Sequence, residues 1–156
     1  MNRYVIVDAA AYADTPKALA WYAQDLPHRS LFARQPEAAH ASVGPWLLQL
    51  PAQSHTQVDG WLRALELDKP VVAWLRSEAG FEAVFQHLEA CLDLHRPNGT
   101  LALLRYWDGR VFLRLQRAFT LQQRRQLMGP LRQWCFQMLG ERYTLDREAL
   151  HATEAG

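Results

Sequence analysis

An acidic side chain, Asp8, stands directly after a short apolar run. Tyr4 to Val7 are bulky and apolar, which predicts a buried strand, and open α/β sheets often hold a ligand or a nucleophile where a strand ends. Three alanines follow, so the segment offers no second carboxylate and no phosphate-binding turn. Two interpretations stay open: a turn aspartate that accepts backbone N–H groups, which we favour, and a catalytic or ligand-binding carboxylate.

Residues of the types that bind zinc recur at intervals of four in His87, Cys91 and His95. Cys91 falls inside an apolar helical stripe, and Pro97 predicts that the helix has ended before His95. The pattern therefore favours a buried thiol with two boundary histidines, and we expect no metal ion and no cofactor.

The sequence contains none of the common catalytic or nucleotide-binding motifs: GxGxxG, GxxxxGK[ST], GxSxG, HExxH or paired CxxC. This favours a binding protein over an enzyme. The alternative is a small α/β hydrolase-like or ligand-binding protein that uses Asp8 at the sheet edge.

Charged and aromatic residues occur together in the segment Arg105, Tyr106, Trp107, Asp108, Gly109, Arg110, which follows the apolar run that begins at Leu101. Asp108 precedes a helical pattern, so it can cap that helix and pair with a nearby arginine. Arginine and aromatic side chains are also frequent at the centres of protein interfaces. The structural role is favoured, and both roles can hold together.

The elements that must position these residues are short strands alternating with helices, the pattern of an α/β domain. We expect one small central sheet of about four strands, with helices on it and a helical C-terminal region. The expected strands are Tyr4 to Val7, Trp46 to Leu50, Val71 to Leu75 and Leu101 to Trp107.

Helices are expected between and after these strands, at Pro16 to Leu26, Ser54 to Leu67, Phe81 to Leu92 and Arg110 to Ala118. Ser54 and Gln57 have capping-box spacing at the start of the second of these helices, and Thr120 and Gln123, with the same spacing, predict a further helix. Gly129 and Pro130 should break that helix, and the spacing of Leu131, Trp134 and Met138 predicts that helical structure resumes as far as Gly140. Residues 1–140 would form the folded domain, and residues 141–156 a partly disordered tail.

Five segments together resemble one known family: RYVIVDAA (Arg3 to Ala10), SLFARQPEA (Ser30 to Ala38), GPWLLQLP (Gly44 to Pro51), VVAWLRS (Val71 to Ser77) and LALLRYWDGRVF (Leu101 to Phe112). In this order they resemble the effector adaptor, or chaperone, family of bacterial type VI secretion, although Gly109 stands where the family commonly has proline. The resemblance implies a protein that binds a toxic effector and helps to load it onto the VgrG spike protein.

Composition sets limits on the remaining possibilities. The 156 residues are 49% hydrophobic and carry a formal net charge of +1, which predicts one globular domain without a strong overall field. We therefore expect neither nucleic acid nor a membrane as partner. The first residues lack the long apolar region of a secretory signal, and the two cysteines suit a reducing compartment, so a cytoplasmic location is expected.

Exposed aromatic and basic side chains are the candidates for partner binding. Trp21 lies beside the apolar stripe of its helix, and Phe32 lies in a polar loop, so both are expected to be partly exposed. Together with the segment above, the candidate partner-binding residues are Trp21, Phe32, Arg105, Tyr106, Asp108 and Arg110. A further basic set, Arg114, Arg117, Arg124, Arg125 and Arg132, is either a solvated face or a dock for an acidic effector segment.

Overall fold

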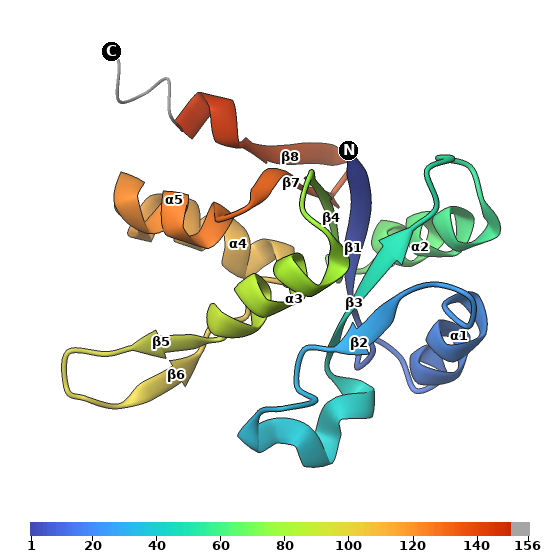
Figure 1. The fold of residues 1–156 in the computed structure, drawn as a ribbon, viewed down its shortest axis with the longest axis horizontal. Coiled ribbons are helices and arrows are strands. Elements are labelled where there is room, and N and C mark those ends of the chain that lie inside the picture. The colour runs from blue at the N-terminus through green and yellow to red at the C-terminus, as the bar shows by residue number, and fades with distance from the viewer. Residues whose placement is uncertain (151–156) are drawn as a thin grey trace.

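A single mixed α/β domain is built around a six-stranded sheet in the computed structural model, which describes residues 1–150 (Figure 1). Every pair of neighbouring strands described there is antiparallel. The strand order is β2 (His28–Ser30), β3 (Pro45–Leu50), β1 (Asn2–Asp8), β4 (Val72–Ser77), β7 (Leu131–Met138) and β8 (Glu141–Asp146). The expected mixed class is confirmed, whereas the expected number of about four strands is too low.

Helices cover the sheet on both faces. One face carries α1 (Thr15–Tyr22) and α2 (Gln57–Asp68), which pack against the β1 residues Val5 and Val7. The other face carries α3 (Phe81–Ala90), α4 (Gly109–Ala118) and α5 (Leu121–Met128), which pack against Tyr4 and Ile6. The alternation of side chains along β1 thus divides the core into two apolar layers.

The helix predictions are largely confirmed, with shifted ends. The helix α1 stops at Tyr22, before the predicted end at Leu26, and residues 23–25 form a turn. Thr56, not Ser54, caps α2. At α5 the predicted capping box is present: the Gln123 backbone N–H donates to Thr120 Oγ1 at 3.1 Å.

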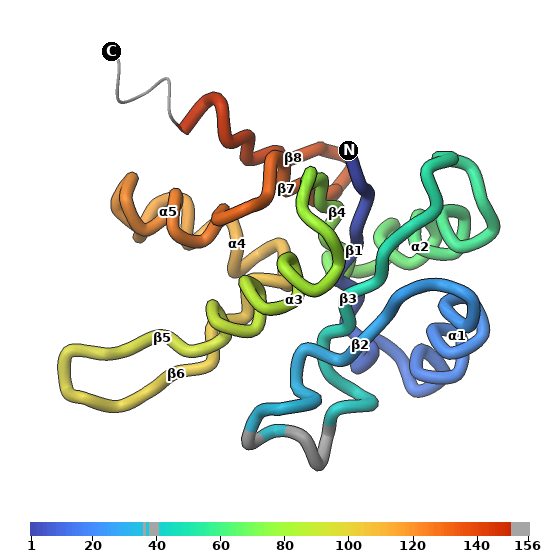
Figure 2. The backbone as a smooth tube through the Cα atoms, in the orientation of Figure 1, coloured from blue at the N-terminus to red at the C-terminus, as the bar shows by residue number. Residues whose placement is uncertain are grey.

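The segment Leu101 to Trp107 is not a strand of the central sheet, so that prediction is wrong. Only β6 (Leu101–Leu103) is extended, and it pairs with β5 (Asp93–His95) in a separate two-stranded hairpin. Figure 2 shows this hairpin reaching away from the sheet before the chain returns to α4. Tyr106 and Trp107 are consecutive and both buried, which the alternating sides of a strand do not allow against a single core layer.

The C-terminal region is also different from the prediction. Leu131 to Met138 form the strand β7 rather than a helix, because β4 and β8 both pair with it. Residues 141–146, predicted to belong to a tail, form the edge strand β8, and residues 147–150 are helical. Residues 151–156 of the predicted tail lie outside the described residues.

A short 3-10 helix, η1 (Pro36–Val43), connects β2 with β3. It follows Leu31 and Phe32, which pack into the layer that contains α3 and α4.

Candidate functional site

The segment between β6 and α4 rests on two buried aromatic rings. The Tyr106 hydroxyl donates to the Leu88 carbonyl of α3 at 2.6 Å, which fixes the turn to the underlying helix. Trp107 packs edge-on against Tyr106, with ring centres 5.4 Å apart, and against Phe32 at 5.8 Å. The aromatic residues therefore serve as a rigid base, and Arg105, which precedes them, is exposed.

Asp108 caps α4, so its predicted structural role is confirmed. Its Oδ1 accepts the Arg110 backbone N–H at 2.9 Å, and its Oδ2 accepts from the Arg110 guanidinium at 2.9 Å. Burial raises the pKa of Asp108, but the bonds from Arg110 outweigh it, so the pKa lies below its ordinary value. The Arg110 side chain is 68% exposed and remains accessible above this cap.

The ends of two sheet strands meet this turn. The Gly109 N–H donates to the Pro70 carbonyl, just before β4, at 3.1 Å. The N–H of Asp8, at the end of β1, donates to the Val71 carbonyl at 3.1 Å. The charges of Arg105, Asp108 and Lys69 all act on Asp8. We call these five charged residues, Asp8, Lys69, Arg105, Asp108 and Arg110, the strand-exit surface.

Asp8 itself has the geometry of a turn residue. Its Oδ1 accepts the Ala10 backbone N–H at 2.9 Å, as the favoured interpretation predicts. Burial raises the pKa of Asp8, and the nearby cations Arg105 and Lys69 only partly oppose this effect. The carboxylate is thus a partly buried member of the strand-exit surface.

Two predicted partner-binding residues stand apart from this surface. Phe32 is only 8% exposed, because its ring lies between Trp107 and the backbone of Gly44, so the predicted exposure of Phe32 is wrong. Trp21 is 65% exposed, as predicted, but it lies on α1, which covers the opposite face of the sheet. The structure brings Arg105, Asp108 and Arg110 together, and it does not bring Trp21 to them. Tyr106 is fully buried beneath them, so its predicted place on the partner-binding surface is wrong.

Residues 3–126 match the family model described as a domain of unknown function, DUF4123. The chain belongs to the DUF4123 family. The match contains the whole strand-exit surface, whereas β7 and β8 lie beyond it. The search of curated proteins and the search of solved structures both found no match.

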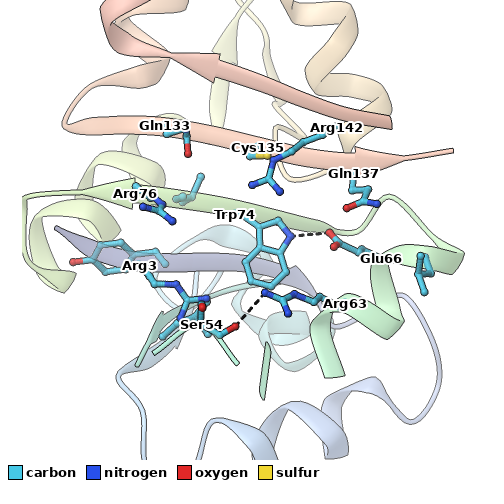
Figure 3. A pocket seen from close by; sticks show the side chains of 14 residues that line it. Arg3, Ser54, Arg63, Glu66, Trp74, Arg76, Gln133, Cys135, Gln137 and Arg142 are labelled. Carbon is cyan, nitrogen blue, oxygen red and sulfur yellow. Dashed lines mark hydrogen bonds between the residues drawn. The ribbon is translucent and has the colours of Figure 1, made fainter. Parts of the chain in front are cut away.

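A second candidate site of this DUF4123 chain is a cavity of about 330 Å³ on the sheet face that carries α2. The floor is formed by β1, β4, β7 and β8, and one wall is formed by α2. Figure 3 shows Trp74 at the centre of the lining, with arginines spread around it. The charged lining residues are Arg3, Arg63, Arg76, Arg142 and Glu66. Sequence reasoning missed this site, since it treated β7 as a helix and β8 as a tail.

Local bonds hold two of the cavity side chains in place. Arg3 pairs with the buried Asp59, which also accepts from the Thr56 hydroxyl at 2.6 Å at the start of α2. Glu66 accepts from the indole N–H of Trp74 at 2.7 Å (Figure 3). Burial raises the pKa of Glu66, and Trp74, Arg142 and Arg63 partly oppose the rise.

The predicted zinc-type residues do not form a ligand set. The His87 Nε2 donates to the Leu127 carbonyl at 2.6 Å, and His95 lies in β5. Cys91 is partly buried, and burial raises its pKa to about 11. Within residues 1–150 no group of three or more His, Cys, Asp or Glu side chains is placed to hold a metal ion.

The predicted basic set is divided by the structure. Arg132 pairs with Glu78 at 2.8 Å and lies near Glu148, so it is not a free docking group.

Among the helices of residues 1–150, none is long and apolar enough to cross a membrane.

Proposed function

We propose that this protein is a cytoplasmic adaptor of type VI secretion that binds a toxic effector and helps to load it onto the VgrG spike protein. The proposal rests on the resemblance of the five ordered segments to that family. Four of the five contribute to one structural unit: β1, β3 and β4 lie side by side in the sheet, and the fifth segment turns onto their ends.

The observation that supports a docking role is the construction of the strand-exit surface. Arg105 and Arg110 are exposed, while the turn that carries them is fixed by buried Tyr106 and Trp107. Because the turn is already fixed, its backbone loses little conformational freedom when a partner binds. None of its five residues lines the α2 cavity, so the two sites can be occupied by different partners. A loader needs this property because it must keep its effector while it meets the spike.

A pull-down from the lysate of the source bacterium tests the proposal. The tagged wild-type chain should enrich a VgrG protein and one large effector. The double change Arg105→Ala and Arg110→Ala should lower recovery of at least one of them, because both exposed cations are removed while the buried frame stays. Arg96→Ala, in the exposed loop between β5 and β6, is the matched control. If neither protein is enriched under conditions where the secretion genes are expressed, the proposal fails.

Phe32 is unsuitable for this test. It is buried against Trp107, and truncating a buried phenylalanine costs about 3–5 kcal/mol of folding free energy. A loss of binding in Phe32→Ala would report damage to the fold rather than a lost contact.

A further inference from the structure

Two arginines stand directly opposite each other on the floor of the α2 cavity. The register pairs Arg3 of β1 with Arg76 of β4, and both side chains line the cavity. Like charges directly opposite on neighbouring strands are destabilising. Asp59 compensates Arg3. Arg76 has no such acid: among the described residues, its side chain forms no ion pair and no hydrogen bond.

Arg142 supplies a second cation at the far side of the floor. It lies on β8 opposite Gln137, whereas Arg76 lies opposite Gln133. Two strand spacings and four residues along a strand put the Cα atoms of Arg76 and Arg142 about 16 Å apart. That distance corresponds to about five residues of an extended chain.

Groups that can bind a peptide lie between these two arginines. In the part of the chain that the structure describes, the Gln133 and Gln137 amides have no hydrogen-bond partner. Each amide can both donate to and accept from a peptide backbone. The indole of Trp74 lies between the arginines, with its N–H fixed by Glu66.

The charge of the cavity is positive although the chain is close to neutral. Four arginines and one carboxylate line it, and the carboxylate of Glu66 is bound to Trp74. The net charge of the whole chain is only +1, so this is a local concentration. A nucleic acid would need a more extensive basic surface than this. A single small anion would be better served by cations gathered at one point, whereas Figure 3 shows them spread around Trp74.

We infer that the α2 cavity binds an extended acidic segment of a partner protein, whose carboxylates pair with Arg76 and Arg142 while Gln133 and Gln137 bind its backbone. Charge complementarity and the unpaired Arg76 identify the occupant. The inference does not depend on the type VI assignment, because any protein with such a segment would fit. It also differs from the strand-exit surface in position, since the two sites share no residue.

Fluorescence anisotropy with the purified full chain tests this inference. The probe is a short fluorescein-labelled peptide of threonine and glycine that carries two glutamates about four residues apart, because an even spacing puts both side chains on one face of an extended chain. Saturable binding is expected at low salt, with weakening as salt rises. A matched peptide with glutamine in place of both glutamates should bind at least about tenfold more weakly.

Variants show whether binding occurs in this cavity. The double change Arg76→Gln and Arg142→Gln should weaken binding of the acidic peptide by about tenfold or more. Its melting temperature should not fall, because both side chains are exposed and Arg76 faces another arginine. The control Arg96→Gln with Arg114→Gln removes two exposed arginines elsewhere and should leave the affinity unchanged.

Several results would overturn the inference. One is that the glutamine peptide binds as tightly as the acidic peptide, and another is that the control variant loses as much affinity as Arg76→Gln with Arg142→Gln. The others are tighter binding of a single-stranded oligonucleotide than of the acidic peptide, and no saturable binding up to about 1 mM peptide. None of these depends on a VgrG protein or an effector, so failure here leaves the adaptor proposal standing, and failure of the pull-down leaves this site standing.

Discussion

Asp59→Asn should destabilise the protein more than any other change of one charged group discussed above. Asp59 is fully buried and holds Arg3 and Thr56 together. Arg3 also donates to the carbonyls of Pro51 and Gln53, each at 2.7 Å. The carboxylate therefore ties β1, the loop after β3 and the start of α2 to one point.

The magnitude follows from these contacts. Breaking a buried ion pair by removing one partner costs about 3–5 kcal/mol, and a hydrogen bond to a charged group contributes about 1.5–3 kcal/mol. In the variant, Arg3 keeps its two carbonyl partners and is slightly exposed. The cost should therefore lie near the lower end of the range for a broken buried ion pair. We expect Asp59→Asn to lower the free energy of unfolding at pH 7 by about 2–3 kcal/mol.

The stability that the Asp59 carboxylate contributes depends on pH, and the direction of its pKa shift gives the sign of this dependence. Burial raises the pKa of Asp59, but bonds from Arg3 and Thr56 outweigh it, so the folded-state pKa lies below the ordinary 3.8. The contribution of Asp59 is then complete above that ordinary value and is lost as pH falls through the lower folded-state pKa. The difference in the free energy of unfolding between the wild type and Asp59→Asn should become smaller as pH falls below about 4.

Urea unfolding followed by circular dichroism, from pH 7 to about pH 3, measures both quantities. Asp68→Asn is the matched control: it removes the same charge from an exposed position at the end of α2 and should change stability by less than about 0.5 kcal/mol. A loss in Asp59→Asn no larger than in this control, or a loss that stays constant down to the acid end, would refute the reasoning.

Three further predictions concern Asp8 of the strand-exit surface and two side chains with buried atoms, Tyr106 and Cys91. Tyr106→Phe removes the bond to the Leu88 carbonyl and should cost about 1 kcal/mol in urea unfolding; unchanged stability would contradict its role as an anchor. Because burial raises the pKa of Cys91 to about 11, its thiol should react with a disulfide reagent at pH 8 far more slowly in the folded than in the unfolded chain, and equal rates would count against this. Burial raises the pKa of Asp8, so the contribution of this one group to stability should fall as pH rises from 3.8 through that raised value. Asp8→Asn can keep the turn bond from Ala10 and should be at least as stable as the wild type at pH 7; a loss of about 1 kcal/mol or more would show that the neighbouring cations outweigh burial.

Local signals were sufficient for much of the fold. The strands β1, β3 and β4 are short runs of bulky apolar residues, and α3 has a complete apolar stripe, so neighbours in sequence already determine these elements. The capping box of Thr120 and Gln123 is equally local. The cap of α2 was misassigned by two residues because Ser54 with Gln57 and Thr56 with Asp59 have the same capping-box spacing.

The segment 131–138 could not be decided by local pattern alone. Leu131, Trp134 and Met138 satisfy helical spacing, which led to the wrong prediction. The same segment also alternates, with Trp134 and Phe136 in one core layer and Gln133 and Gln137 on the other face. Pairing with β4 and β8 decides between the two, and these partners are distant in sequence or across the turn at Leu139, where φ is 52°.

The candidate sites were foreseen to different degrees for the same reason. The strand-exit surface is mostly one continuous segment, so its residues could be named together, and only the approach of Asp8 and Lys69 required the fold. The burial of Phe32 could not be predicted, because the loop around it is polar and its ring packs beside Gly44, which is distant in sequence.

Near-neutral net charge excludes a strong overall field, but it does not exclude a strongly charged surface. The chain balances 17 basic against 16 acidic side chains, yet the fold places Arg3, Arg63, Arg76 and Arg142 around one cavity with Glu66. They come from β1, α2, β4 and β8, and no stretch of sequence contains more than one of them within ten residues. The charge on one face of a sheet depends on the strand register. A shift of one residue in β4 would move Arg76 to the opposite face, which carries α3, α4 and α5. The binding chemistry of this cavity is therefore a property of strand pairing, which composition cannot reveal.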